Sequence, residues 1–198
     1  MKLIEKTKRE RDDRKSSHSV ARNRWSPAQR RLHWAIALLI LLAFPIAWVM
    51  AAVPFADLLL KFVLFQVHKT LGLLVLLAAL ARLLVRLRRG RPDWDEDLAD
   101  WQRKAARHLH AALYVLILAV PVLGYFVACT APAQIPTLFL GVVPVPAIVG
   151  VNKAWFPVLL DLHRAAAITL VLLAIGHAAA AVQHHRRGRT VLRRMWSG

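Results

Sequence analysis

The stretch "DLHRAAAITLVLLAIGH", residues 161–177, places two histidines in an apolar run typical of a membrane-spanning helix. His163 and His177 are fourteen residues apart. In an α-helix this spacing gives a rise of about 21 Å, and the two side chains point within about 40° of each other. Because imidazole is a common metal ligand and ionisable groups inside a membrane are costly, we interpret both histidines as ligands, at two separate sites.

The helix face between these histidines favours a bulky ligand. It carries mostly small side chains, which are Ala166, Ala167, Leu170 and Ala174. Small residues leave room for a flat group that lies against the helix. The pattern therefore predicts a planar cofactor at each of the two depths.

Each site needs a second ligand from another helix, and two apolar segments supply one at the matching depth. His33, in "RRLHWAIALL", begins the first segment at the level predicted for His177. His68, in "FQVHKTLG", begins the second at the level of His163, and Gly72 one turn later removes bulk. The predicted pairs are His33 with His177 and His68 with His163.

One position stays open on geometry alone. His108 and His110 begin a third apolar segment at the same depth as His33, so either could replace it as a ligand. His184 and His185 stand beside an arginine cluster and are interpreted as solvated or headgroup-facing, and His18 lies in the N-terminal tail.

The residue types favour b-type haem over other cofactors. Two imidazoles per level suit haem, and facing helices of a four-helix bundle are a recurrent cofactor site. The chain has one cysteine, Cys129, so it lacks the C-x-x-C-H motif of haem c. Zinc requires three or four convergent ligands, and a proton relay normally requires carboxylates that the apolar spans lack. We expect two haem b groups, with iron as the metal.

The composition predicts an all-α integral membrane protein. Hydrophobic residues make up 58% of the 198 residues, and the formal net charge is +17. A span needs about 20 apolar residues. Proline-rich sequence at "APAQIPTLFLGVVPVPAIVG" must interrupt the longest uncharged run. We predict a four-helix transmembrane bundle with helices at about 30–52, 63–87, 105–128 and 157–183.

The distribution of Lys and Arg predicts the orientation in the membrane. Residues 1–31 hold eleven of them, residues 82–107 hold eight and residues 184–198 hold five. The two remaining connections are poor in basic residues, so both termini are expected on the cytoplasmic side. We interpret the charge as topology and contact with anionic lipid, and expect no nucleic-acid partner.

The predicted organisation is one transmembrane domain between two basic tails. The domain covers residues 29–185, and the tails cover residues 1–28 and 186–198. The N-terminal tail is too charged for a cleavable signal peptide, so we expect it to remain in the cytoplasm.

Four motifs in order resemble the bacterial cytochrome b561 family: "RWSPAQRRLHW", "VHKTLGLLVLLAALARLLVRLR", "HLHAALYVLILAVPVLGYF" and "LHRAAAITLVLLAIGHAAAAVQHH". The resemblance covers about residues 24–196. It implies a di-haem b protein of the bacterial inner membrane whose ligands are His33, His68, His163 and His177, and it favours His33 over His110. The N-terminal extension and the apolar external loop 129–156 depart from the family pattern.

The resemblance also implies a reaction, in which superoxide is the electron donor and ubiquinone the acceptor. Bis-histidine ligation fills both axial positions, so outer-sphere electron transfer is the expected chemistry. Lys69 and Arg164, each directly after a predicted external ligand, are expected to steer superoxide or to contact haem propionates. Lys61 and Lys153 add charge to the same rim. The alternative is a membrane-anchor subunit that passes electrons between a partner dehydrogenase or hydrogenase and quinone, with "DWDEDLADWQRK" as a docking loop.

Overall fold

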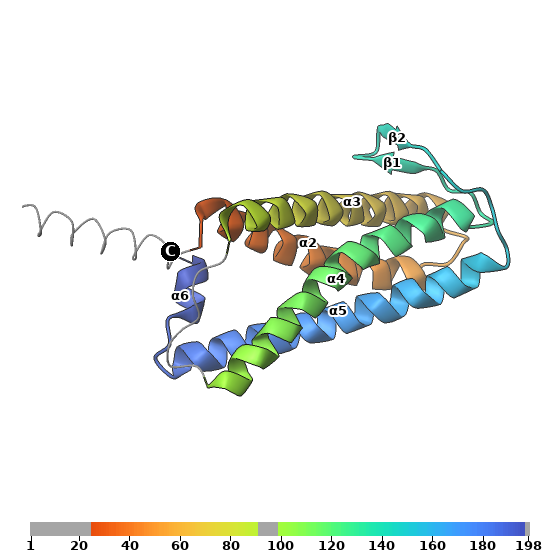
Figure 1. The fold of residues 1–198 in the computed structure, drawn as a ribbon. Helices are drawn as coiled ribbons and strands as arrows, with labels where there is room; N and C mark the ends of the chain where they lie inside the picture. Colours follow the sequence, from red (N-terminus) through yellow and green to blue (C-terminus); the bar gives the residue numbers. More distant parts are fainter. Residues whose placement is uncertain (1–24, 91–98, 197–198) are drawn as a thin grey trace, which may run out of the picture.

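The uncharged apolar runs fold into four long helices in the computed structural model, which describes residues 25–90 and 99–196 (Figure 1). All four are long and apolar enough to cross a membrane. They exceed the predicted ranges by up to five residues at an end. Their bounds are α2 Pro27–Ala52, α3 Leu58–Arg89, α4 Asp100–Thr130 and α5 Trp155–Arg186. The predicted four-helix membrane bundle is confirmed.

The helices pack as two pairs. Helix α2 lies along α3, α4 lies along α5, and the contact of α3 with α4 joins the pairs (Figure 1). A hairpin of β1 (Thr137–Phe139) and β2 (Val143–Val145) lies at one end of the bundle, and the short helix α6 (Val191–Trp196) lies at the other. These are called the hairpin end and the α6 end below.

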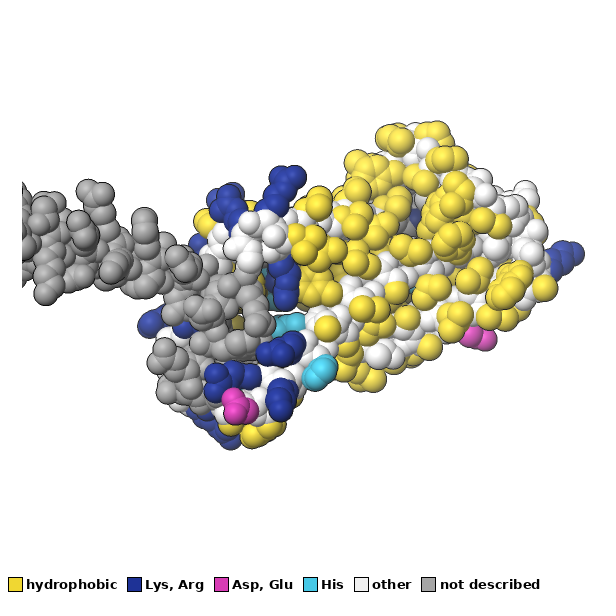
Figure 2. All heavy atoms as spheres, in the orientation of Figure 1, with side chains coloured by type: hydrophobic (Ala, Val, Ile, Leu, Met, Phe, Trp, Pro, Cys, Tyr) yellow, Lys and Arg dark blue, Asp and Glu magenta, His cyan; other side chains and the backbone are white. Residues whose placement is uncertain are grey.

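The outer surface of the bundle is suited to lipid. Figure 2 shows hydrophobic side chains over the middle of the visible face and most of the visible Lys and Arg at the α6 end. On α5, Leu172 and Ile175 are 63% and 60% exposed, whereas Leu170 on the histidine face is 4% exposed. The face predicted for the ligands is therefore the inward face.

Helix α2 begins at a fixed point. Ser26 and Gln29 form a capping box, in which the Gln29 N–H donates to Ser26 Oγ and the Ser26 N–H donates to Gln29 Oε1. Pro27 occupies the first turn, where its missing N–H costs nothing. The Gln29 amide also donates to the Gly90 carbonyl over 3.0 Å, which ties the start of α2 to the end of α3. The position of His33, one turn later, is set by these contacts.

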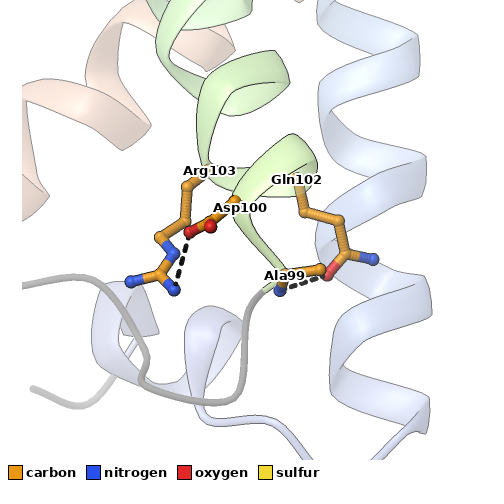
Figure 3. Close-up of polar contacts among 4 residues, drawn as sticks. All are labelled: Ala99, Asp100, Gln102 and Arg103. Atoms are coloured by element: carbon orange, nitrogen blue, oxygen red, sulfur yellow. Dashed lines mark hydrogen bonds and ion pairs between the residues drawn. The ribbon is translucent and has the colours of Figure 1, made fainter.

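Helix α4 also begins with local polar contacts (Figure 3). The Ala99 N–H donates to Gln102 Oε1 over 3.3 Å, and Asp100 pairs with Arg103 over 3.1 Å. Gln102 Oε1 accepts a second hydrogen bond from Arg189, which follows α5 in the chain. The start of α4 is thus joined to the end of α5.

Helix α6 falls within the predicted C-terminal tail and lies against the start of α2. The Trp34 indole N–H donates to the Met195 carbonyl over 3.0 Å, and its ring meets Trp196 edge to face at 5.2 Å. Arg30 donates to the Trp196 carbonyl. The end of the chain therefore covers the α2 turn that contains His33. Residues 1–24 of the predicted N-terminal tail, and residues 93–98 of the predicted docking loop, lie outside the described residues.

The connection between α4 and α5 contains the hairpin, and side chains of α3 attach it to the bundle. Gln66 is 7% exposed, donates to the Pro136 carbonyl over 2.8 Å and accepts from the Leu138 N–H over 2.9 Å. Thr70 accepts from the Leu140 N–H. A helix side chain thus hydrogen-bonds to β1 as a neighbouring strand would.

We expect Gln66→Leu to weaken the attachment of the hairpin by about 1–3 kcal/mol, because the substitution leaves two backbone groups unpaired. Hydrogen exchange of the segment that contains the Leu138 amide measures the effect. Val67→Ala is the matched control, because Val67 is the next residue and is 39% exposed. Equal exchange rates in the two variants would contradict the assignment.

Candidate functional site

The structure brings the four predicted ligands together as two facing pairs. His33 of α2 faces His177 of α5 with ring centroids 6.2 Å apart, and His68 of α3 faces His163 of α5 at 6.3 Å. The rings are nearly perpendicular, at 81° and 84°. Each pair bridges the two helix pairs of the bundle, and the two pairs lie at opposite ends of α5.

The spacing within each pair matches that of two imidazoles on one metal. A bond of about 2 Å from metal to each nitrogen, with each ring centre roughly 1 Å behind its nitrogen, separates the centres by about 6 Å. The third histidine at the α6 end differs, because His110 meets His177 at 5.1 Å, edge to face. That separation is shorter than the separation of two rings on opposite sides of one metal. His33 thus has the spacing of a ligand opposite His177. His108 is exposed.

Both imidazoles at the hairpin end are oriented by backbone carbonyls. His68 Nδ1 lies 3.2 Å from the Ala43 carbonyl, and His163 Nδ1 lies 3.0 Å from the Val120 carbonyl. A carbonyl can only accept, so Nδ1 carries the proton in each ring and Nε2 keeps its lone pair. This is the tautomer that binds a metal through Nε2 while Nδ1 donates a hydrogen bond to a neighbouring group.

Gly124 of α4 makes the position of the His163 ring possible, and this role of Gly124 was not predicted from the sequence. A Cβ on Gly124 would lie 2.9 Å from His163 Cε1, a distance that real side chains avoid. The absent side chain lets the ring approach α4 and reach the Val120 carbonyl, one turn earlier. The only sequence signal was a glycine inside an apolar helix, which costs about 1 kcal/mol relative to alanine and so suggests a packing reason. Gly72, in contrast, borders open space.

At the α6 end, Arg82 turns inward. Its Nε donates to Tyr114 Oη over 3.1 Å, and its Nη1 donates to the Gln29 carbonyl over 3.0 Å. Gln29 is one turn before His33 on α2, so this contact places the Arg82 guanidinium near His33. It therefore belongs to this site.

The basic residues predicted for the rim of the hairpin end differ in their surroundings. Lys69 donates to the carbonyls of Ile135 and Pro136, over 2.8 and 3.2 Å, but no acid pairs with it among the described residues. Arg164 is exposed, with only a 3.9 Å contact to Asp161. Lys61 is buried and donates to the Val53 carbonyl at the end of α2, so its role is to cap a helix. Lys153 is exposed.

The described residues contain no cluster of three or more His, Cys, Asp and Glu side chains that could hold a metal ion. A metal bound by only two imidazoles must take its remaining ligands from the cofactor that carries it. Fold and site together define a class: membrane proteins whose four-helix bundle holds flat metal groups between histidines.

Comparison with known proteins agrees with this class. The family described as prokaryotic cytochrome b561 matches residues 24–198. Cytochrome b561 homolog 1 of Escherichia coli is 29% identical over 178 residues, which are 87% of this chain and 97% of that protein. Cytochrome b561 homolog 2 of the same organism is 31% identical over 120 residues, 61% of this chain and 63% of that protein. The chain belongs to the prokaryotic cytochrome b561 family.

Membership makes the chain a multi-pass bacterial membrane protein that transfers electrons and binds haem b. The residues present fit such a group. Each imidazole pair has the spacing of two axial ligands, and the hairpin-end pair has the required tautomer. A porphyrin supplies the four remaining nitrogens around the iron, which accounts for a site with only two protein ligands.

We expect Gly124→Ala to disturb the site at the hairpin end, because the new Cβ would push the His163 ring out of place. The haem content should fall by up to about half, or the spectrum of one haem should change. Visible and electron paramagnetic resonance spectra measure both.

Gly176→Ala is the matched control, because a Cβ there would meet no described atom within 4 Å. Since alanine favours helix by about 1 kcal/mol over glycine, a loss confined to Gly124→Ala is steric. Unchanged spectra in both variants would contradict the role of Gly124.

Proposed function

We propose that the chain binds two b haems and carries single electrons between them across the membrane. His33 and His177 hold the haem at the α6 end, and His68 and His163 hold the haem at the hairpin end. The observation that carries this proposal is the presence of two imidazole pairs with centroid separations of 6.2 and 6.3 Å.

The residues support electron transfer rather than chemistry at the metal. When bound, the haem supplies a reversible one-electron couple, and two imidazoles leave no axial position for oxygen. The carbonyls of Ala43 and Val120 hold the ligand rings in orientation, and the apolar surface of the bundle keeps the sites away from water.

We propose superoxide as the donor at the hairpin end and ubiquinone as the final acceptor. One electron leaves each superoxide anion, which departs as oxygen, and two electrons with two protons convert ubiquinone to its quinol. The support in this chain is positive charge at the hairpin end. Lys69 and Arg164 each follow a proposed ligand. No described acid pairs with Lys69, and Arg164 is exposed, with a 3.9 Å contact to Asp161. A positive rim attracts an anionic substrate and raises its rate of encounter.

We propose that the α6 end faces the cytoplasm, with both chain termini on that side. The support is the excess of Lys and Arg at this end, visible over the α6 end in Figure 2, since basic residues are retained on the cytoplasmic side. The hairpin end then faces outward, where superoxide would arrive.

Haem content tests the ligand pairs. Purified wild-type protein is expected to contain about two b haems per chain, and His177→Ala about one, because each pair requires both of its imidazoles. Haem extraction and visible spectra against protein concentration give the ratio.

His185→Ala is the matched control, because His185 is exposed at the end of the same helix and faces no other ligand. A wild-type protein without haem would overturn the proposed function. A full haem content in His177→Ala would overturn the pairing.

Substitution of Lys69 and Arg164 by Gln tests the donor. We expect the double variant to oxidise superoxide at least several-fold more slowly, with a weaker dependence on ionic strength, because exposed charges are screened by salt. Stopped-flow reduction of the haems by superoxide measures the rate, and the haem content serves as a check of folding.

Lys153→Gln is the matched control, since it removes an exposed positive charge from the same end without touching a residue beside a ligand. Its effect should be smaller. A double variant with the wild-type rate and salt dependence would exclude steering by these two residues.

A further inference from the structure

Helix α3 repeats the spacing of the ligand helix with a different residue. Arg82 follows His68 by fourteen residues, just as His177 follows His163 on α5. The same spacing gives a rise of about 21 Å and nearly the same direction. Arg82 therefore occupies, at the α6 end, the face of α3 that His68 occupies at the hairpin end. At this position of α3, the hairpin end has the proposed ligand His68 and the α6 end has the cation Arg82.

The guanidinium of Arg82 is held by two neighbouring helices. Tyr114 of α4 accepts from Nε, and the Gln29 carbonyl of α2 accepts from Nη1. Gln29 is itself 3% exposed and fixed by the capping box of α2. The charge is therefore fixed relative to the ligands, because each of its partners is part of a helix.

No acid neutralises this charge within the described chain. The ion pairs there involve Arg103 and Arg164, and the partners of Arg82 are neutral oxygens. The guanidinium lies close to His33, because its Nη1 donates to the carbonyl of Gln29, one turn before His33 on α2. An electrostatic interaction with both His33 and His177 agrees with this position. In the low-dielectric interior of a bundle, such an interaction is stronger than it would be in water.

The hairpin-end pair has the opposite electrostatic character. Its two imidazoles donate to the carbonyls of Ala43 and Val120, and a hydrogen bond of this kind makes the ligand more basic. More basic ligands favour the oxidised iron. The polar neighbours of His33 and His177 are instead His110, whose ring meets that of His177 at 5.1 Å, and the cation Arg82.

We propose that Arg82 raises the reduction potential of the α6-end haem above that of the hairpin-end haem and so sets the direction of electron transfer. This inference rests on the proposed pair of haem sites. Reduction removes one positive charge from an iron centre, so a fixed cation nearby favours the reduced form. With both haems bound, one electron would then move from the hairpin end, where the haem is oxidised, to the α6 end, where the haem is reduced.

A redox titration of the two haems, followed in the visible spectrum, tests this role. Arg82→Gln is expected to lower one midpoint potential by at least about 59 mV and to leave the other unchanged. For a one-electron couple this shift is a tenfold change in the equilibrium constant. Arg82→Lys keeps the charge and should restore most of the wild-type value. The shifted haem is assigned with His163→Ala and His177→Ala, each of which retains a single site.

Arg86→Gln is the matched control. Arg86 lies one turn further along α3 and also contacts Tyr114, with its guanidinium carbon 4.9 Å from the centre of that ring. Removing this charge should change either potential much less. If Arg82→Gln fails to fold, Tyr114→Phe removes one partner of the guanidinium and should lower the same potential by a smaller amount.

The outcomes separate this inference from the proposed function. Two haems whose potentials are unchanged, or equally shifted, in Arg82→Gln would overturn the role of Arg82 while leaving the haem sites intact. Loss of the α6-end haem in Arg82→Gln and also in Arg82→Lys would overturn it as well, because the residue would then serve binding. A wild-type chain with no haem would overturn the proposed function first.

Discussion

Two imidazoles that share one metal must lie a fixed distance apart, and the packing of the helices provides this distance at both ends of the bundle. Helix α5 supplies one ring to each level, while α2 and α3 supply the opposite rings. Gly124 is part of the same requirement, because a side chain there would occupy the place of the His163 ring. Few of the described side chains are buried between the helices.

The membrane imposes a second requirement, which is that polar groups find partners inside the protein. Lys61 caps the end of α2, Gln66 pairs with β1, and the Tyr125 hydroxyl donates to the Pro146 carbonyl over 2.6 Å. Each of these side chains comes from a helix and satisfies backbone of a connection or a helix end. The connection between α4 and α5 is held close to the hairpin-end site in this way.

The two sites share a ligand set and differ in their surroundings. At the hairpin end, backbone carbonyls orient both rings, and positive charges of Lys69 and Arg164 lie next to the ligands in sequence. At the α6 end, a fixed guanidinium lies beside the rings, and α6 covers the turn that carries His33. This asymmetry suits a protein that accepts electrons at one face and passes them to the other, since identical sites would give no direction to the transfer.

The sequence by itself determined the four spans and the inward face of α5, and it predicted the histidine pairs from their depth, because helix periodicity and membrane thickness depend only on spacing along the chain. It left His110 and His33 as alternatives, since depth does not report the separation of rings on different helices. In the tertiary structure the rings of His33 and His177 are 6.2 Å apart and those of His110 and His177 are 5.1 Å apart, and this difference supports His33 as the proposed ligand. The tertiary structure also revealed the carbonyl partners of His68 and His163, the gap at Gly124 and the inward turn of Arg82. These depend on how helices far apart in the chain approach one another, and no spacing within a single helix encodes that approach.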